Sequence, residues 1–507
     1  MIIPSRRRGF AAACASAAAI GGSIAALQYH RLGLTLSHYD ARAHLVVARR
    51  IIDSITPGWQ QIGAVWLPLP HLLNMFPVQI DALYRSGASA VAISIVSFAV
   101  ATATVAWIAA DITASPVAAG VAALVFAINP NVLYLQATPM TEPLLIALMA
   151  AAVAMLMQPC APGLVGAAFA LACLTRYEAW PVTAAALALA FVARWRGGES
   201  VETAVRETGR IATLPAIAIV AFLIFSRIVI GRWFVSSGFF VPENKALGRP
   251  WIAAAEIAWG VRTLSSAPLI VISSAGLIAV IVAAVRHRDR RRTLIPLSLA
   301  AAALLPWAAF VNGHPFRIRY MVVLLPLEAI GVGAAAGLVP RFKVPSAIAL
   351  TAVTLYALRP LDRAAPMIVE AQWEQPNAAP RREVTNCLRA GYDGETIMAS
   401  MGSLGHYMQE AARDGFNIRD FLHEGNGDIW LAALDGPRPF VGWILIEEKA
   451  NGGDMLAKRA RDNPHFLDGF ARVCEGGGLA LFERAGPAAG GPASQSRGRG
   501  VRNGSRP

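Results

Sequence analysis

The chain has 507 residues, of which 55% are hydrophobic and only 15% are charged, and its mean hydropathy is +0.49. A soluble globular protein carries about 25% charged residues, so this composition excludes a soluble fold and predicts several membrane spans. The net charge of +13 does not indicate nucleic-acid binding, because the basic residues gather in short loops between apolar segments and partly in the tail after Gly486.

The N-terminal segment sets the predicted orientation. Arg6-Arg7-Arg8 precede a long apolar segment at about 10–29. Basic residues beside a first helix hold that side in the cytoplasm. The segment resembles a signal peptide in composition, but it is long and has no convincing cleavage site. We therefore interpret it as a retained first helix.

Ten further apolar segments follow a long first loop at 30–86. They lie at about 87–110, 116–135, 142–158, 162–175, 178–194, 210–230, 264–285, 293–311, 319–338 and 345–358. The segment at 162–175 is short, since a crossing needs about 20 residues. Eleven crossings place the basic loops at 194–196, 286–292 and 341–343 in the cytoplasm, as the positive-inside rule requires. We predict a multi-pass protein of the inner or plasma membrane, with residues 1–358 as its transmembrane domain.

The same topology places the other ionisable residues near membrane boundaries on the extracytoplasmic face. Asp40 lies in the first loop. The later connections hold Glu142, Arg176, Glu178, Arg317, Arg319 and the neighbouring Tyr320. Ionisable groups at membrane depth are costly and are usually functional. We therefore predict that these residues form a site.

The first loop carries two segments of helical character. Residues 40–52 have apolar and basic positions at helical spacing, and residues 66–73 have a content that suits the bilayer interface. Two interpretations are open: helices that lie on the membrane surface and frame a cavity, or helices that only pack over the bundle. Asp40 is either a catalytic acid or the N-cap of its helix. His44 shares its helix face, where an orienting role is favoured over metal binding.

Each remaining candidate also has a structural alternative. Glu142 suits the first turn of a helix, where the helix dipole favours acids. The alternative for Arg176 and Glu178 is a structural ion pair. The alternative for Arg317 and Arg319 is a role as interfacial anchors.

The chain changes character after about residue 358. Residues 359–485 mix β-like runs at 395–399, 440–446 and 479–482 with helical stretches at 404–414 and 454–460. This pattern predicts a small extracytoplasmic α/β domain. Cys387 and Cys474 are its only cysteines, and whether they pair in an oxidising compartment is left open. Residues 486–507 are predicted to be disordered.

The order and common sidedness of these motifs resemble the GT-C glycosyltransferases. The motifs are Asp40 in the first loop, Pro-Met-Thr-Glu-Pro at 139–143, Leu-Thr-Arg-Tyr-Glu at 174–178, and Arg-Ile-Arg-Tyr at 317–320 followed by Leu325-Pro326. The resemblance covers about residues 10–360 and favours the branch that contains protein O-mannosyltransferases and lipid A aminoarabinose transferases. It implies a polytopic α-helical membrane protein with a GT-C-like fold of about eleven transmembrane helices and a small C-terminal α/β domain.

The resemblance also implies an activity. Members transfer a sugar, with inversion, from a polyprenyl-phosphate donor to an extracytoplasmic acceptor, which here is a protein, a lipid or a glycan. Many members carry two adjacent acids where this chain has only Asp40. Whether Glu142 or Glu178 supplies a second carboxylate is therefore open.

The residue types suit this chemistry on their own. An acceptor hydroxyl must lose a proton, which Asp40 can take as general base. The departing phosphate gains negative charge, which the guanidinium groups of Arg317 and Arg319 can bind. The other predicted substrate-binding residues are His44, Glu142, Arg176, Glu178 and Tyr320.

The sequence leaves several matters open. It holds no HExxH, CxxC, Walker or Rossmann motif, and dependence on a divalent metal is left undecided. Two other classes of function are alternatives: a transporter or lipid flippase, and a non-catalytic assembly protein. Transporters tend to show internal repeats, and none is evident here.

Overall fold

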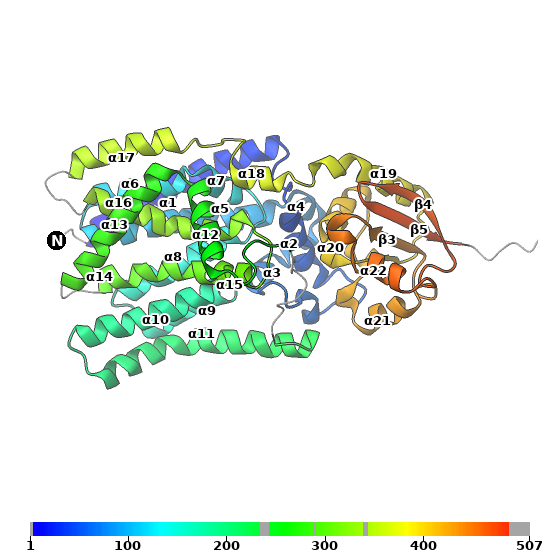
Figure 1. The fold of residues 1–507 in the computed structure, drawn as a ribbon, viewed down its shortest axis with the longest axis horizontal. Coiled ribbons are helices and arrows are strands. Elements are labelled where there is room, and N and C mark those ends of the chain that lie inside the picture. The colour runs from blue at the N-terminus through cyan, green and yellow to red at the C-terminus, as the bar shows by residue number, and fades with distance from the viewer. Residues whose placement is uncertain (1–3, 234–242, 287–290, 338–342, 486–507) are drawn as a thin grey trace, which may run out of the picture.

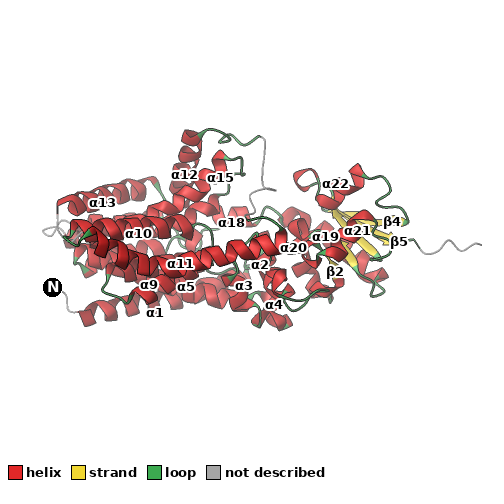
Figure 2. Ribbon diagram, turned by 90° about the horizontal axis from the view of Figure 1, so that it is seen from below, coloured by secondary structure: helices red, strands yellow, loops and turns green. Residues whose placement is uncertain are grey.

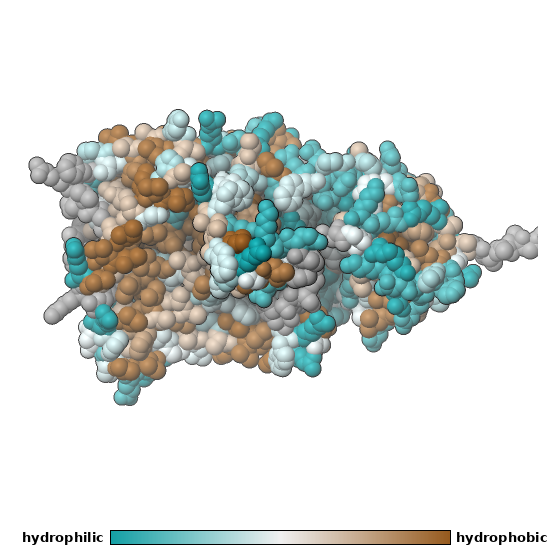
Figure 3. Space-filling model, viewed as in Figure 1, coloured by the Kyte–Doolittle hydropathy of each residue, from teal (hydrophilic) through white to brown (hydrophobic). Residues whose placement is uncertain are grey.

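The computed structural model describes residues 4–233, 243–286, 291–337 and 343–485. It consists of a helical bundle at the N-terminal end, a small sheet domain at the C-terminal end, and the first loop between them (Figure 1). Figure 3 shows hydrophobic side chains over the bundle and hydrophilic ones over the sheet domain. This division matches a membrane part and a water-exposed part.

All eleven predicted spans are helical. The first seven correspond to α1 (Pro4–Arg31), α5 (Ala88–Thr113), α6 with α7 (Pro116–Ala127, Pro130–Leu135), α8 (Glu142–Met157), α9 (Pro162–Cys173), α10 (Ala179–Arg196) and α11 (Val201–Ile230). The last four are α13 (Ala267–Arg286), a continuous run of α14, η3 and α15 (Arg291–Leu294, Ile295–Ala303, Leu304–Val311), η4 with α16 (Ile318–Leu324, Leu325–Gly337), and α17 (Lys343–Ala357). A further helix, α12 (Pro250–Leu264), occupies the second half of the connection between the predicted spans at 210–230 and 264–285.

Not every helix meets the length of a full crossing. Within the described ranges, six are long and apolar enough to cross a bilayer: Arg8–Arg31, Ala88–Thr113, Val201–Ile230, Ala267–Arg286, Arg291–Val311 and Ile318–Gly337. Helices α6, α8, α9 and α17 are apolar but shorter. The predicted bundle is therefore present, but several of its helices are shorter than the apolar segments suggested.

Small residues let the central helices approach closely. Helix α13 packs on α16, where a Cβ added to Gly276 would lie 1.9 Å from the carbonyl oxygen of Gly331. A Cβ on Gly331 would lie 2.7 Å from the carbonyl oxygen of Ser273. Only glycine permits this backbone contact, which is a common way to pack helices in lipid.

The loop connections that hold the candidate residues lie at the end of the bundle nearest the sheet domain. The opposite end holds the first residues of α1, together with α14 (Figure 1). Arg291 of α14 pairs with Glu199, 2.7 Å away in the connection after α10, so these two basic regions share that end. The basic loops at 286–292 and 341–343 lie partly outside the described residues, and the tail at 486–507 lies wholly outside them.

The first loop forms a layer between the two parts. It contains α2 (Tyr39–Arg50), η1 (Trp59–Ile62), α3 (Leu69–Asn74), η2 (Pro77–Gln79) and α4 (Asp81–Ser86). Both ribbon views place α2 between the bundle and α20 (Met401–Ala411) of the C-terminal domain (Figure 2). Leu45, Val46 and Ala48 are buried in one cluster with Leu404 and Met408. The helix is therefore covered rather than exposed along a membrane surface.

The C-terminal domain is built on a five-stranded sheet in the order β2-β1-β3-β5-β4. The strands are β1 (Ile397–Ala399), β2 (Phe421–Leu422), β3 (Trp443–Glu447), β4 (Phe470–Gly476) and β5 (Leu479–Arg484). Strand β1 pairs in parallel with β2 and β3, while β5 pairs antiparallel with β3 and β4. The mixed sheet confirms the predicted α/β class.

Helices and short turns connect these strands and lead into the domain. They are α18 (Pro366–Ala371), η6 (Gln375–Asn377), α19 (Ala378–Gly391), η7 (Ala412–Asp414), η8 (Ile418–Asp420), η9 (Glu424–Asn426), α21 (Asp428–Asp435), η10 (Ala450–Gly452) and α22 (Met455–Asp462). Cys387 of α19 forms a disulfide with Cys474 of β4, with Cα atoms 6.5 Å apart. This pairing, which the sequence left open, fastens α19 to the edge strand.

Candidate functional site

Asp40 is not the N-cap of its helix. His38 has that role, because its Nδ1 accepts a hydrogen bond from the backbone N–H of Asp40 at 3.1 Å. The carboxylate of Asp40 is instead directed to Arg319 of η4, with which it forms an ion pair. The two residues are 279 positions apart in the sequence, and each is only 7% exposed. The structure therefore brings together two predicted site residues.

The ion pair dominates the electrostatics of Asp40. Burial alone would raise its pKa, but Arg319, with smaller contributions from His38 and His44, outweighs burial and lowers the pKa to about 2. Arg319 is not fully occupied by this contact. Its Nε, also buried, has no hydrogen-bond partner among the described residues. A buried guanidinium with an unused donor is suited to a second anionic partner.

Arg176 connects two further predicted residues. Its guanidinium lies 3.0 Å from the carboxylate of Glu142 and 2.7 Å from that of Glu178, and it donates to the Thr141 hydroxyl at 3.1 Å. Glu142 begins α8 and is fully buried. The ion pair of Arg176 and Glu178, which the sequence offered as the structural alternative to a site role, is thus present. Glu142 forms a second ion pair with the same guanidinium. Two carboxylates on one guanidinium leave this cluster with a net negative charge.

His44 lies within electrostatic range of both the Asp40–Arg319 ion pair and the Arg176 cluster. It is one turn beyond Asp40 on α2 and is buried. Burial and the neighbouring His71 lower the pKa of His44 well below its usual value, Asp40 acts to raise it, and Arg176 and Arg319 act to lower it further. The charges of the aspartate and of both arginines therefore act on the ring of His44.

Arg317 and Tyr320 flank this arrangement. The guanidinium of Arg317 lies over the ring of Trp373, 5.5 Å from its centre, rather than beside Asp40. Tyr320 lies beside Arg319, 5.4 Å from guanidinium to ring centre, and its hydroxyl is 3.4 Å from Nε2 of His314. Of the two arginines predicted as phosphate ligands, Arg319 pairs with Asp40 and Arg317 lies over Trp373.

The sequence did not single out Glu370 and His38. Glu370 of α18 is 2% exposed, and neither oxygen of its carboxylate has a hydrogen-bond partner among the described residues. Nε2 of His38 lies 3.6 Å from one oxygen of this carboxylate. Burial, with contributions from Asp40 and Glu370, raises the pKa of Tyr39 to about 12. Glu370 is therefore a further buried carboxylate that, like Asp40, acts on Tyr39.

No sequence signal pointed to this contact. Glu370 follows Asp40 by 330 residues and lies in the charged segment that we assigned to the C-terminal domain. Helix α18, which carries it, instead packs on α7 and η4 of the bundle.

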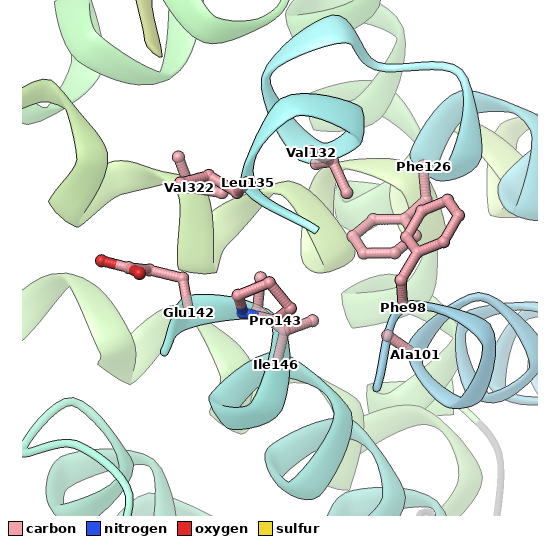
Figure 4. Close-up of a pocket in the computed structure, with 9 residues that line it drawn as sticks. All are labelled: Phe98, Ala101, Phe126, Val132, Leu135, Glu142, Pro143, Ile146 and Val322. Atoms are coloured by element: carbon pink, nitrogen blue, oxygen red, sulfur yellow. The ribbon is translucent and has the colours of Figure 1, made fainter. Parts of the chain in front are cut away.

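A small apolar pocket lies in the bundle beside Glu142 (Figure 4). It is lined by Phe98, Phe126, Pro143 and Ile146 among others, and its volume is about 10 Å³. The carboxylate of Glu142 points away from the aromatic end of this pocket (Figure 4). A volume of this size holds at most about one water molecule, so the pocket is not a sugar site. Within the described ranges, no group of three or more His, Cys, Asp or Glu side chains could hold a metal ion.

The helical bundle and the C-terminal sheet define a polytopic, mostly helical membrane protein with a small mixed-sheet domain. The chain is similar in structure to ArnT from Cupriavidus metallidurans, solved with undecaprenyl phosphate, with 13% sequence identity and a TM-score of 0.56. The similarity covers 92% of this chain and 98% of that one, so it includes the C-terminal domain. The predicted GT-C fold is thereby confirmed.

A second similar structure is the Archaeoglobus fulgidus oligosaccharyltransferase, in complex with zinc and sulfate, with 12% identity and a TM-score of 0.46. This similarity covers 82% of this chain and 64% of that one. No protein-family model and no curated protein sequence matches the chain.

Proposed function

We propose that this protein is a GT-C glycosyltransferase that transfers a sugar, with inversion, from a polyprenyl-phosphate donor to an extracytoplasmic acceptor. The observation that carries the proposal is the buried pair of Asp40 and Arg319 at the end of the bundle. It places a carboxylate and a guanidinium with an unused donor side by side, in a chain with the fold of a protein solved with undecaprenyl phosphate.

The roles follow from the chemistry of the two groups. Arg319 binds the donor phosphate, because a guanidinium forms bidentate hydrogen bonds with phosphate oxygens and stabilises the charge of the leaving group. Asp40 then accepts the proton of the attacking hydroxyl. While it is paired with Arg319, Asp40 has a pKa of about 2 and is a poor base. Binding of the phosphate to Arg319 releases Asp40 from the pair and raises its basicity.

The neighbouring residues have supporting roles in this proposal. Arg176 is already paired with Glu142 and Glu178, so it is less available to phosphate than Arg319 is. Glu142 and Glu178 hold it in place, and the net negative cluster favours hydroxyl groups over a second phosphate. Arg317 lies over Trp373 and Tyr320 lies beside Arg319, so both flank the phosphate-binding position of this proposal. That domain lies outside the cytoplasm, on the same side as the site.

The proposal is tested with purified protein in lipid nanodiscs. Wild-type protein binds undecaprenyl phosphate and transfers sugar from a polyprenyl-phosphate donor, detected by mass spectrometry of the acceptor fraction. Arg319→Gln loses carrier binding. Asp40→Asn keeps or tightens carrier binding, because Arg319 no longer has a competing carboxylate, but transfer falls by roughly 100-fold or more. Persistent transfer by Asp40→Asn would refute the role of Asp40, and a wild-type protein that does not bind the carrier would refute the function.

A further inference from the structure

His44 belongs to a hydrogen-bonded chain of groups that the proposed reaction does not use. Its Nδ1 lies 3.1 Å from Nε2 of His71, and Nδ1 of His71 lies 3.1 Å from the carbonyl oxygen of Leu67. His44 and His71 are 6% and 1% exposed. The ring of Trp66 covers His44, with centres 4.1 Å apart, so the imidazole has little freedom to turn.

The carbonyl oxygen at the end of this hydrogen-bonded series determines which ring nitrogens carry a hydrogen. A backbone carbonyl only accepts, so Nδ1 of His71 carries the hydrogen. Burial and the nearby Arg50 lower the pKa of His71 to about 3, and the ring is therefore neutral at pH 7. Its Nε2 is then an acceptor, and Nδ1 of His44 must be the donor in the bond between the two rings.

The same logic determines the remaining nitrogen of His44. The pKa of His44 is also well below its usual value, so this ring is neutral and carries its one hydrogen on Nδ1. Its Nε2 is an unprotonated acceptor, and it has no hydrogen-bond partner among the described residues. His38 shows the opposite state, because its Nδ1 accepts from Asp40 and is unprotonated.

We propose that Nε2 of His44 accepts a hydrogen bond from a substrate hydroxyl beside Asp40, and that His71 keeps it in the accepting state. This inference rests on the proposed function and specifies the chemical group that Nε2 of His44 binds. The phosphate of a polyprenyl-phosphate sugar is a diester, which carries no hydrogen at neutral pH and cannot donate to Nε2. The phosphate therefore goes to Arg319, and His44 selects an O–H group. That group belongs either to the sugar of the donor or to the attacking acceptor.

Two substitutions separate the two nitrogens of His44. His44→Asn places an amide N–H near the position of Nδ1 and keeps a donor for His71, but it has no acceptor at the Nε2 position. His44→Gln reaches the Nε2 position with an acceptor oxygen. His465→Asn, at a side chain that is 84% exposed in the C-terminal domain, is the matched control. A monodisperse elution profile and an unchanged circular dichroism spectrum show that each variant is folded.

Three measurements are made on each form of the full chain: affinity for bare undecaprenyl phosphate, affinity for undecaprenyl phosphates loaded with a panel of hexoses and pentoses, and rate of transfer. We expect bare-carrier affinity to be unchanged in both His44 variants and lost in Arg319→Gln. Sugar-dependent affinity or transfer falls roughly tenfold in His44→Asn, the range for losing one hydrogen bond, and largely returns in His44→Gln. Loss of sugar-dependent affinity identifies the donor sugar as the source of the hydroxyl, and loss of transfer alone identifies the acceptor.

The outcomes also distinguish a failure of this inference from a failure of the proposed function. A wild-type protein that does not bind undecaprenyl phosphate refutes the proposed function. If binding depends on Arg319 but His44→Asn matches wild type in both other assays, only the inference about His44 is refuted. It is equally refuted if His44→Asn weakens binding of the bare carrier, or if His44→Gln performs no better than His44→Asn.

Discussion

The ion pair of Asp40 and Arg319 predicts a measurable coupling in stability. The pKa of Asp40 falls from 3.8 to about 2 in the folded protein. Since a tenfold change in an acid constant corresponds to about 1.4 kcal/mol, this fall represents about 2 kcal/mol of stabilisation of the carboxylate. Asp40→Asn keeps the size of the side chain but leaves a buried guanidinium without a counter-charge. Removing one partner of a buried pair costs about 3–5 kcal/mol.

The assay is equilibrium unfolding of the unliganded protein in mixed micelles with increasing denaturing detergent. We expect Asp40→Asn and Arg319→Gln each to lower the free energy of unfolding by about 3 kcal/mol. In the double variant, the loss in free energy of unfolding should be about 2 kcal/mol smaller than the sum of the two single losses. The reason is that neither buried charge is then left without its partner. Asp435→Asn is the control, since its pair with Arg459 at 2.9 Å is exposed and such pairs contribute at most about 1 kcal/mol.

The pair also has a signature in pH. A carboxylate whose pKa is lowered by folding stabilises the native state above its unfolded pKa of about 3.9, and this contribution is lost as the pH falls through its folded value. For Asp40 the loss should occur between about pH 4 and pH 2 in wild type, and Asp40→Asn should lack it. Additive effects in the double variant, or wild-type stability of Asp40→Asn, would refute the ion pair as a stabilising contact.

Three further predictions test other parts of the structure. Arg176→Gln leaves two buried carboxylates without their counter-charge, so we expect about 3 kcal/mol lower stability in the same micelle assay, and wild-type stability would contradict the cluster. Gly276→Ala places a methyl group 1.9 Å from a backbone oxygen and should lower the yield of folded protein. The control Gly21→Ala has no atom within 4 Å of the added Cβ and should leave the yield unchanged. Equal yields of the two variants would contradict the close helix packing. Cys387 and Cys474 should react with a membrane-impermeant maleimide only after reduction, and labelling without reductant would show that the disulfide is absent.

The sequence predicted the fold well where the signal was local. Apolar segments of about 20 residues mark the helices, because each span must satisfy its backbone hydrogen bonds internally. The strands at 397–399, 443–447 and 479–484 correspond to the β-like runs that the sequence predicted at 395–399, 440–446 and 479–482. Strand β4 was missed because it is an edge strand with charged side chains, such as Arg472 and Glu475, and lacks a continuous apolar run.

The site was predictable in its members but not in its pairing. The predicted topology placed Asp40, Glu142, Arg176 and Arg319 at one end of the bundle. This deduction needs only the order of the spans and the positions of the basic loops. Which carboxylate meets which guanidinium depends on how the helices pack in three dimensions. The contact of Glu370 with His38 depends on α18 folding back onto the bundle, for which the sequence carries no periodic signal.

The position of the first loop gives the C-terminal domain a part in the site. Helix α2, which carries Asp40 and His44, is held by hydrophobic contacts with α20 and by an ion pair between Arg42 and Glu410 at 2.5 Å. The N-cap of the same helix lies beside Glu370, just before that domain. A helix of 12 residues is marginal in isolation, so its position depends on these contacts. The C-terminal domain therefore fixes the helix that presents Asp40 to Arg319, and movement of this domain would directly change the separation of these two residues.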